Sequence, residues 1–560
     1  MTAADPPQRM AILAAAIADL ESGRFATAAA ACAALLARDP DDLDALLVCG
    51  LAAGAGGDTE HAARLLRHVA AARPTAPHPC CDLTALLRRT GQSARIEPQY
   101  RAALRLAPDD AALRYAFADF LHDAGRHAEA IALLSEALAL RPDFAPARNL
   151  LAIALAASGD TAAAIDELRD SVAREPQQAA AWANLGLLLK DDGRFDAALA
   201  AYDTARLLAP GDAQIRVNRV VALLRAGRWA EAWPDYEWRL ILAGHATPPP
   251  RLLPMLSSLP GQGGGPALAG RTVLAVHEDG FGDTLHFARY LPLLAARGAR
   301  VLACVPAALT RVMRTMPGVA AVCGPDEPRP AHDHVCAFLS LPRAFETTPG
   351  SIPAPIPYLH ADPALAAAWA RRLPPGALRV GLVWAGQARP SLPGFGVLDG
   401  RRSTTLATLA PLATVAGTTF ISLQHGPAAA QAGTPPPGMV LHDPMPAVRD
   451  FADTAAIVAN LDLVVSVDTA VLHLAGALGK PVFLLDRYDH CWRWLSGRSD
   501  SPWYPAMRIF RQARIGEWQP VLQRAAAALA AFAARSGAGS PRHPVAVDLL
   551  EVPETVERDA

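Results

Sequence analysis

A strict 34-residue spacing of glycine and proline constrains the first half of this chain more than any other feature. The glycines are Gly23, Gly57, Gly91, Gly125, Gly159, Gly193 and Gly227, and the prolines are Pro40, Pro74, Pro108, Pro142, Pro176 and Pro210. Glycine tolerates the left-handed backbone that ends many helices, and proline stops a helix from extending. The spacing therefore predicts helix, turn, helix and stop, repeated about six and a half to seven times.

Small side chains recur with the same period, five residues after the glycine, at Ala28, Ala62, Ala130, Ala164, Ala198 and Ala232. The pattern resembles the tetratricopeptide repeat. The clearest copy spans 179–212, where the residues in the family's positions are Trp182, Leu185, Gly186, Gly193, Phe195, Ala198, Tyr202, Ala205 and Pro210. In the third copy Ile96 replaces the small residue and Pro98 falls inside the expected second helix. We expect a local distortion there rather than a lost repeat.

Two asparagines occupy the same position in successive repeats. Asn184 and Asn218 lie 34 residues apart, on the expected first helices, which line the concave surface of such an array. An amide has both a donor and an acceptor, which suits it to an extended peptide backbone. Two interpretations stay open: capture of an acceptor protein by these amides, and a residue that is merely common at this repeat position.

The chain divides where the periodicity changes. We expect a repeat array over 9–243, a Pro- and Gly-rich linker over 244–270, and two α/β lobes over 271–350 and 379–535. The Pro-containing tail, 536–560, is expected to be disordered. The expected strands are 272–278, 299–305, 334–340, 379–386, 418–424, 439–442, 461–468, 481–486 and 507–510. Short apolar strands that alternate with helices predict parallel sheets in two Rossmann-like lobes facing a cleft.

Composition excludes several classes of protein. The 52 Lys and Arg nearly balance the 54 Asp and Glu, which argues against broad capture of nucleic acid. The eight cysteines are scattered without a C-x-x-C pair, which favours a reducing compartment and hence a cytoplasmic protein. We expect no signal peptide, because no basic segment precedes the first apolar stretch, and no transmembrane helix.

Two segments carry a second resemblance. Residues 277–301, HEDGFGDTLHFARYLPLLAARGARV, and 466–485, SVDTAVLHLAGALGKPVFLL, resemble the two halves of GT-B glycosyltransferases related to heptosyltransferases. Repeats followed by such a domain are similar to bacterial tetratricopeptide-repeat glycosyltransferases, a group that includes flagellin-modifying enzymes. The similarity covers residues 9–525. It implies inverting sugar transfer, without metal or cofactor, from a nucleotide-sugar to an acceptor held by the repeats, flagellin or another surface protein.

The first candidate site residue follows the first strand of the α/β region. Asp283 ends the turn Gly280-Phe281-Gly282-Asp283, where glycines let a substrate approach the backbone. The resemblance implies that Asp283 is the base that accepts the proton of the acceptor hydroxyl. The alternative is a plain helix cap, a role that Asp favours.

A second group of candidates follows the fourth strand of the C-terminal lobe. Asp468 and Thr469 open a helix that also carries His473. The resemblance implies that this segment lines the donor site, and a helix N-terminus suits the negative charge of a diphosphate. The open alternatives are a plain cap for Asp468 and a buried core residue for His473.

The turns after the first two C-terminal strands supply the remaining donor-site candidates, which are Trp384, Gln387, Arg402, Gln424 and His425. The forked donors of Arg402 suit diphosphate oxygens. Related sequences have Asn where this chain has Gln387, and often Lys where it has His425. These departures leave open a second function class, a repeat scaffold with an inactive transferase domain. A third is a glycan-assembly or lipopolysaccharide-assembly enzyme.

One aromatic cluster is left over from this assignment. Its members are Trp492, Trp494, Trp503 and Tyr504. They are interpreted mainly as packing for a C-terminal helix, and a place in the floor of the cleft is the alternative.

Overall fold

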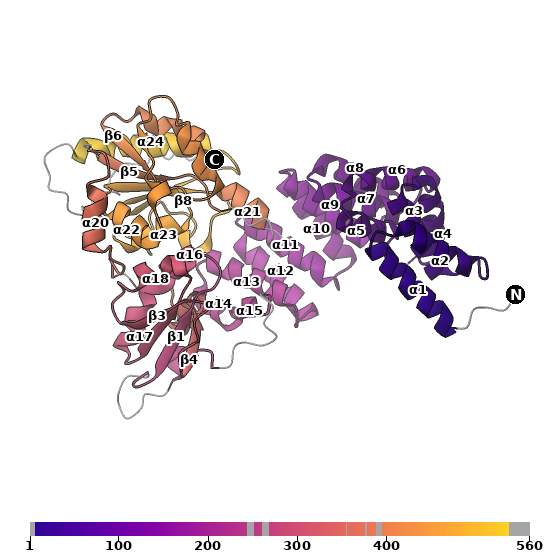
Figure 1. Cartoon of the computed structure of the whole chain (residues 1–560), viewed down its shortest axis with the longest axis horizontal. Coiled ribbons are helices and arrows are strands. Elements are labelled where there is room, and N and C mark those ends of the chain that lie inside the picture. The colour runs from indigo at the N-terminus through magenta and orange to yellow at the C-terminus, as the bar shows by residue number, and fades with distance from the viewer. Residues whose placement is uncertain are drawn as a thin grey trace. The chain divides into compact units, whose positions relative to one another are not determined.

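The computed structural model describes residues 6–74, 76–242, 251–259, 268–353, 355–375, 378–387 and 395–536 (Figure 1). The chain forms two compact units, Met1–Gly211 and Asp212–Ala560. The tail after residue 536 and most of the expected linker, 244–250 and 260–267, lie outside the described residues. Within the described ranges, no helix combines the length and the apolar character needed to cross a lipid bilayer.

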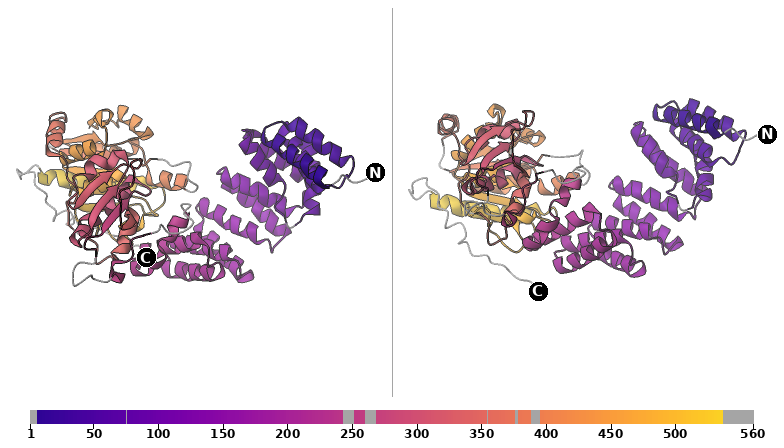
Figure 2. Two further views of the ribbon diagram at one scale, coloured as in Figure 1. Left: turned by 60° about the horizontal axis from the view of Figure 1, so that its bottom comes forward. Right: turned by 90° about the horizontal axis from the view of Figure 1, so that it is seen from below.

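The first unit is a stack of paired helices, as Figures 1 and 2 show. Its helices are α1 (Pro6–Glu21), α2 (Phe25–Leu36), α3 (Leu43–Gly56), α4 (Thr59–Ala72), α5 (Cys80–Arg89), α6 (Ile96–Leu106), α7 (Ala111–Asp123), α8 (His127–Leu140), α9 (Ala145–Ala157), α10 (Thr161–Arg174), α11 (Ala179–Asp191) and α12 (Phe195–Leu208). This confirms the predicted helical solenoid.

The glycines and prolines of the 34-residue pattern have the predicted local roles. All seven glycines have a positive φ, between 72° and 103°, at the end of the first helix of a pair. In the repeats that end at Pro108, Pro142 and Pro176, the carbonyl oxygen of the proline, which no intrahelical N–H can reach, accepts a bond from a side chain six residues later. Arg148 donates to Pro142 at 3.1 Å, Trp182 donates to Pro176 at 2.9 Å, and Arg114 donates to Pro108.

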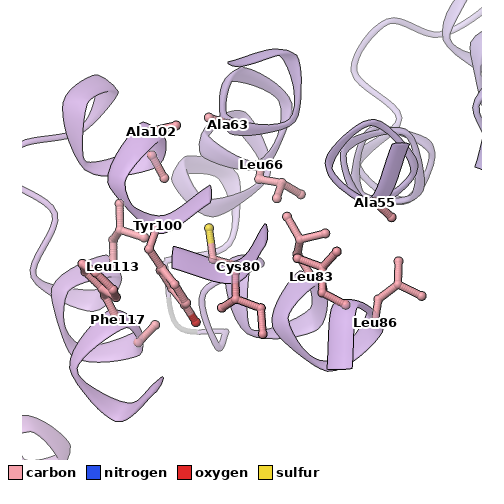
Figure 3. Packing of buried hydrophobic residues seen from close by; sticks show 14 of the residues in the cluster. Ala55, Ala63, Leu66, Cys80, Leu83, Leu86, Tyr100, Ala102, Leu113 and Phe117 are labelled. Carbon is pink, nitrogen blue, oxygen red and sulfur yellow. The ribbon is translucent and has the colours of Figure 1, made fainter. Parts of the chain in front are cut away.

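The predicted distortion of the third repeat takes the form of a 3₁₀ turn. This turn, Ser93–Arg95, precedes α6, so that α6 starts at Ile96 and Pro98 falls in its first turn, where no backbone N–H is missed. Ile96 is buried in place of the usual alanine. Figure 3 shows Tyr100 of α6 beside Phe117 of α7, with ring centroids 5.0 Å apart, so stacking continues through the altered repeat.

The second unit begins with the last helix pair of the repeat pattern and continues into a first parallel sheet. The helices are α13 (Ala213–Arg225), α14 (Trp229–Ala232) and α15 (Trp238–Leu242). The strands are β1 (Thr272–Val276), β2 (Arg300–Cys304), β3 (Val319–Cys323) and β4 (His334–Ala337), in the order β3-β2-β1-β4. The edge strand β3 was not predicted from the sequence, because its apolar run of five residues, Val-Ala-Ala-Val-Cys, contains two alanines, which are uncommon in strands.

A second parallel sheet follows, in the order β10-β9-β8-β5-β6-β7. Its strands are β5 (Leu378–Val383), β6 (Thr418–Ser422), β7 (Leu441–His442), β8 (Leu463–Val467), β9 (Val482–Asp486) and β10 (Met507–Arg511). In Figure 1, α24 (Trp518–Ser536) lies on one side of this sheet, and α22 (Phe451–Ala459) and α23 (Ala470–Ala477) lie on the other. The expectation of parallel sheets with helices is confirmed.

Each sheet has one place where the strand order reverses. In the first sheet the chain runs from β1 outward to β3 and then returns to place β4 on the other side of β1. In the second it runs from β5 outward to β7 and returns to place β8 beside β5. Crevices for ligands form at such reversals, outside the carboxyl ends of the strands. A ligand site is therefore expected at the turns after β1, β5 and β8.

We predict that Gly193→Ala lowers the free energy of unfolding of the array by about 1 kcal/mol, because a Cβ is strained in the left-handed conformation. Gly193 has a φ of 78° and open space around its Cα, so the backbone is the cause. Gly211→Ala is the matched control, since Gly211 also has open space but no left-handed φ. Urea unfolding followed by circular dichroism measures both, and equal midpoints would contradict the prediction.

Candidate functional site

Helices from the two sheets touch at the carboxyl ends of β1 and β8. Helix α16 (Phe281–Phe287) follows β1 and packs against α23, which follows β8. A Cβ on Gly282 would lie 3.0 Å from His473 Cδ2 and 3.4 Å from Ala470 Cα. Only glycine fits this contact without a shift, so Gly282 brings the two reversal points together.

Asp283 lies in the first turn of α16, one residue from that contact. One carboxylate oxygen accepts a bond from the backbone N–H of Gly280 at 3.3 Å. The other forms an ion pair with Arg493, and 22% of the Asp283 side chain is exposed. The N-cap of α16 is Gly280, and Asp283 lies three residues later, inside the helix. Asp283 therefore bonds the first turn of its own helix and also pairs with Arg493, which belongs to the domain of the second sheet.

Arg493 is a site residue that the sequence analysis did not single out. It lies in the 3₁₀ turn Trp492–Trp494 after β9, and its side chain is only 11% exposed. Its Nη1 donates to Cys491 Sγ at 3.0 Å, and its Cζ lies 5.1 Å from the ring centroid of Phe287. The sequence feature that could have indicated Arg493 is an arginine between two tryptophans, in a turn at the carboxyl end of a strand.

Asp468 contacts the same region from the second sheet. Trp494 Nε1 donates to one of its oxygens at 3.1 Å, and His473 Nε2 lies 3.5 Å from the other. The N-cap of α23 is Thr469, so the plain-cap interpretation of Asp468 is wrong. Burial, the largest influence, opposes ionisation, but the contacts with His473, Trp494 and the Arg493 charge together hold the pKa of Asp468 below its usual value.

Two buried imidazoles and a phenol fill the interior behind these carboxylates. Tyr504 Oη lies 2.9 Å from His286 Nδ1 and 3.0 Å from His473 Nδ1. Burial, aided by the positive charge of Arg493, lowers the pKa of both histidines. Both are therefore neutral at neutral pH, and His473 can donate from Nε2 toward Asp468.

The aromatic cluster packs against elements other than the expected C-terminal helix. Trp229 of α14 stacks on Trp503 at 5.6 Å between ring centroids and meets Trp492 edge-on at 5.2 Å. Trp494 stacks on His473 at 5.5 Å. The packing interpretation therefore named the wrong partner, because these rings contact the last repeat helix and the site.

The turns after β5 and β6 are tied together by Gln424. Its Oε1 accepts from the backbone N–H groups of Trp384 and Ala385, at 3.0 and 2.9 Å, and its Nε2 donates to the carbonyl of His425 at 2.7 Å. The Trp384 side chain is fully buried in the core of the second sheet. Both side chains shape the turn, and at Trp384 only the backbone can face a ligand.

Arg402 and Gln387 meet at the carboxyl end of β5. Arg402 Nη2 donates to the Gln387 carbonyl at 3.2 Å and pairs with Asp399 at 2.9 Å. A Cβ on Gly386 would lie 2.6 Å from Arg402 Nε, so this glycine admits the guanidinium. His425 is exposed beside this turn, and partial burial lowers its pKa, with Asp443 opposing.

The carboxyl ends of β5 and β8 are neighbours, because Val383 pairs with Ser466. The Arg402 turn and the Asp468–Thr469 turn therefore leave adjacent strands at the reversal point of the second sheet. Asn184 and Asn218 lie elsewhere, half-buried on α11 and α13, in the first and second unit respectively. The Asn218 side-chain oxygen accepts from Gln214 at 2.8 Å.

Comparison with known families supports the division seen in the fold. Tetratricopeptide-repeat families match residues 13–77, 86–144, 121–188 and 185–240. The repeats are tetratricopeptide repeats. Glycosyltransferase family 9 (heptosyltransferase) matches residues 448–488, the segment that carries Asp468, Thr469 and His473. This match supports a glycosyltransferase.

Individual relatives cover parts of the chain. Protein FlbA of Caulobacter vibrioides is 28% identical over 360 residues, which are 59% of this chain and 58% of FlbA. PilF of Pseudomonas aeruginosa is 19% identical and covers 37% of this chain and 93% of its own, with a TM-score of 0.28. YrrB, a repeat protein with an unusual peptide-binding site, is 18% identical and covers 33% and 95%, with a TM-score of 0.26.

The buried imidazoles predict a pH dependence of stability. A histidine whose pKa is lowered by folding stays neutral while the unfolded chain takes up a proton, near its ordinary pKa of about 6.5. Its contribution is complete above that pH and is lost below it, by up to about 1.4 kcal/mol per pH unit. We expect His473→Gln, which cannot titrate, to flatten the fall of the melting temperature between pH 7.5 and 5.

The matched control for this measurement is His360→Gln, an exposed histidine in the same unit. Its melting curve should follow that of the wild type across the same pH range. If His473→Gln and the wild type fell in parallel, His473 would not titrate differently in the two states.

Proposed function

We propose that this protein is an inverting, metal-independent glycosyltransferase of the GT-B type, which moves a sugar from a nucleotide-activated donor to an acceptor hydroxyl. The observation that carries the proposal is the contact of α16, whose first turn holds Asp283, with α23, which lies inside the heptosyltransferase-like segment of the second sheet. A base from one layer and a donor site in the other are what a direct displacement between two substrates requires.

In the proposed reaction the acceptor oxygen attacks the anomeric carbon of the donor sugar. The bond from that carbon to the diphosphate breaks, and the hydroxyl proton passes to the Asp283 carboxylate. One bond forms and one breaks at the carbon, on opposite faces, which inverts its configuration. The exposed fifth of the Asp283 side chain leaves an edge for the hydroxyl to approach.

The donor would lie along the turns after β5, β6 and β8. The Arg402 guanidinium and the N-terminus of α23 supply positive charge for the diphosphate. Asp468, held ionised, is an acceptor for sugar or ribose hydroxyls, and Thr469, Gln387 and His425 belong to the same turns. His473 holds Asp468 from the interior, and Gln424 keeps the turns in place. We assign neutralisation of the leaving group to the Arg402 guanidinium and the helix N-terminus.

The repeats would bring the acceptor. Tetratricopeptide-repeat arrays bind protein segments along their concave surface, so we propose a protein acceptor, flagellin or another surface protein. We place the reaction in the cytoplasm, because all eight cysteines are unpaired in the structure.

Replacement of the proposed base gives the first functional prediction. Asp283→Asn keeps the size of the side chain but cannot take the proton, so turnover should fall at least ~100-fold while donor affinity is kept. Asp362→Asn is the control, since Asp362 caps α20 (Pro363–Ala370) and Asn caps a helix equally well. Calorimetry and hydrolysis assays with UDP-, GDP-, ADP- and dTDP-linked sugars measure both. Normal turnover in a folded Asp283→Asn variant would remove Asp283 from this role.

The same panel separates an enzyme from a scaffold. Binding and slow hydrolysis of one donor by the wild type support the transferase. No binding to any nucleotide-sugar would favour a repeat scaffold.

The asparagines give a prediction for acceptor capture. Asn184→Ala with Asn218→Ala should weaken acceptor-dependent transfer by on the order of 10-fold or more, because each lost hydrogen bond costs roughly 0.5–1.5 kcal/mol. Donor hydrolysis without acceptor should not change. Ser135→Ala is the control, because Ser135 is exposed on α8, the second helix of its repeat. Equal transfer by the double variant and the wild type would place acceptor capture elsewhere.

A further inference from the structure

A buried guanidinium interacts with both carboxylates of the candidate site. Arg493 forms the ion pair with Asp283, and its charge also acts on Asp468. We propose that Arg493 is a positioning residue, which fixes the orientation of the Asp283 carboxylate before substrates bind. The inference rests on the proposed function, because a base has a task only if the transfer takes place.

The contacts of Asp283 show how the orientation is fixed. One oxygen is held by the backbone N–H of Gly280 and the other by Arg493, so the carboxylate plane cannot rotate freely. A general base must be aimed at the proton that it removes, and misplacement of about 1 Å is costly. Two anchors from different elements leave the exposed edge of Asp283 as the side open to an acceptor hydroxyl.

The other groups that face Asp283 do not replace this charge. His277, at the end of β1, and His473, on α23, both interact with Asp283 electrostatically. Burial lowers the pKa of each, so neither is charged at neutral pH. Asp468 also interacts with Arg493 and carries a negative charge. Among the described groups that face Asp283, Arg493 supplies the permanent positive charge.

Arg493 is itself held from three directions. Its guanidinium lies over the rings of Phe287 and Trp492, with Cζ 5.1 and 5.3 Å from their centroids, and donates to Cys491. Trp492 in turn packs edge-on against Trp229 of α14. An exposed arginine readily exchanges its ion pair for contacts with water. The rings and Cys491 instead restrict the rotamers of Arg493, and a positioning role requires such a restricted side chain.

The test separates kcat from the dissociation constant of the donor, because a misplaced base slows the chemical step without weakening donor binding. The substrate is whichever UDP-, GDP-, ADP- or dTDP-linked sugar the wild type hydrolyses fastest. Loss of the anchor in Arg493→Met should lower kcat by on the order of 10-fold or more, while the donor dissociation constant stays near the wild-type value. Arg493→Lys keeps a charged donor to the carboxylate, so it should recover part of the lost kcat.

Arg498→Met is the matched control, since Arg498 lies in the same loop and pairs with Asp500 at 2.5 Å. Its kcat and donor affinity should match those of the wild type. A purely structural Arg493 would weaken donor binding together with kcat in both Arg493 variants, and that result would overturn the proposal.

A second measurement needs no turnover. Removal of Arg493 leaves the partly buried carboxylates of Asp283 and Asp468 without their shared cation, so Arg493→Met should lower the melting temperature at pH 7.5. Adding Asp283→Asn should restore part of that loss. If the two substitutions instead lowered the melting temperature additively, the ion pair would not exist in solution, and the proposal would be wrong.

The outcomes keep the two proposals apart. An active wild type and an Arg493→Met variant of equal kcat would overturn the role of Arg493 alone. A wild type that neither binds nor hydrolyses any donor of the panel would overturn the proposed function, and the positioning role with it.

Discussion

The contact of α16 with α23 at Gly282 is the constraint on which the candidate site depends. Each helix starts at the reversal point of its own sheet, where free N–H groups and short polar side chains gather. Because position 282 has no Cβ, the helices approach until His473 lies against the glycine. Asp283 of one layer then faces Arg493 of the other. A larger residue at 282 would separate the layers and open this ion pair.

The close approach of α16 and α23 places charged side chains where little water reaches them, and the surrounding residues compensate for this. Two carboxylates and one guanidinium are held with little access to water, where an unpaired charge is costly. The histidines behind them stay neutral, and Tyr504 connects their rings through hydrogen bonds. The buried tryptophans exclude water from the cation and leave it a single charged partner on each side. The charged groups of the site are therefore surrounded by aromatic side chains.

Much of this fold could be predicted from the sequence because local rules determine it. A glycine at φ 75° and a proline stop act within a few residues of themselves, so their spacing specified the helices. Apolar runs rich in β-branched residues specified the central strands, whereas the short run of β3 contains two alanines and was missed. The role of Asp468 was harder to predict, since the choice between Thr469 and Asp468 as cap depends on where Trp494 lies. The pairing of Asp283 with Arg493 joins residues 210 positions apart, beyond the reach of any local pattern.

The compact unit that holds both sheets starts at Asp212, before the Pro- and Gly-rich segment, and so includes the last helix pair of the repeats. Three contacts fasten that pair: Trp229 stacks on Trp503, Trp233 donates to the Thr347 carbonyl, and Arg239 pairs with Glu278. The segment richest in proline is thus a poor place to cut the chain. A chimera that exchanges one repeat array for another should be joined near residue 211, so that each α/β half keeps the helices that shield its own arginine.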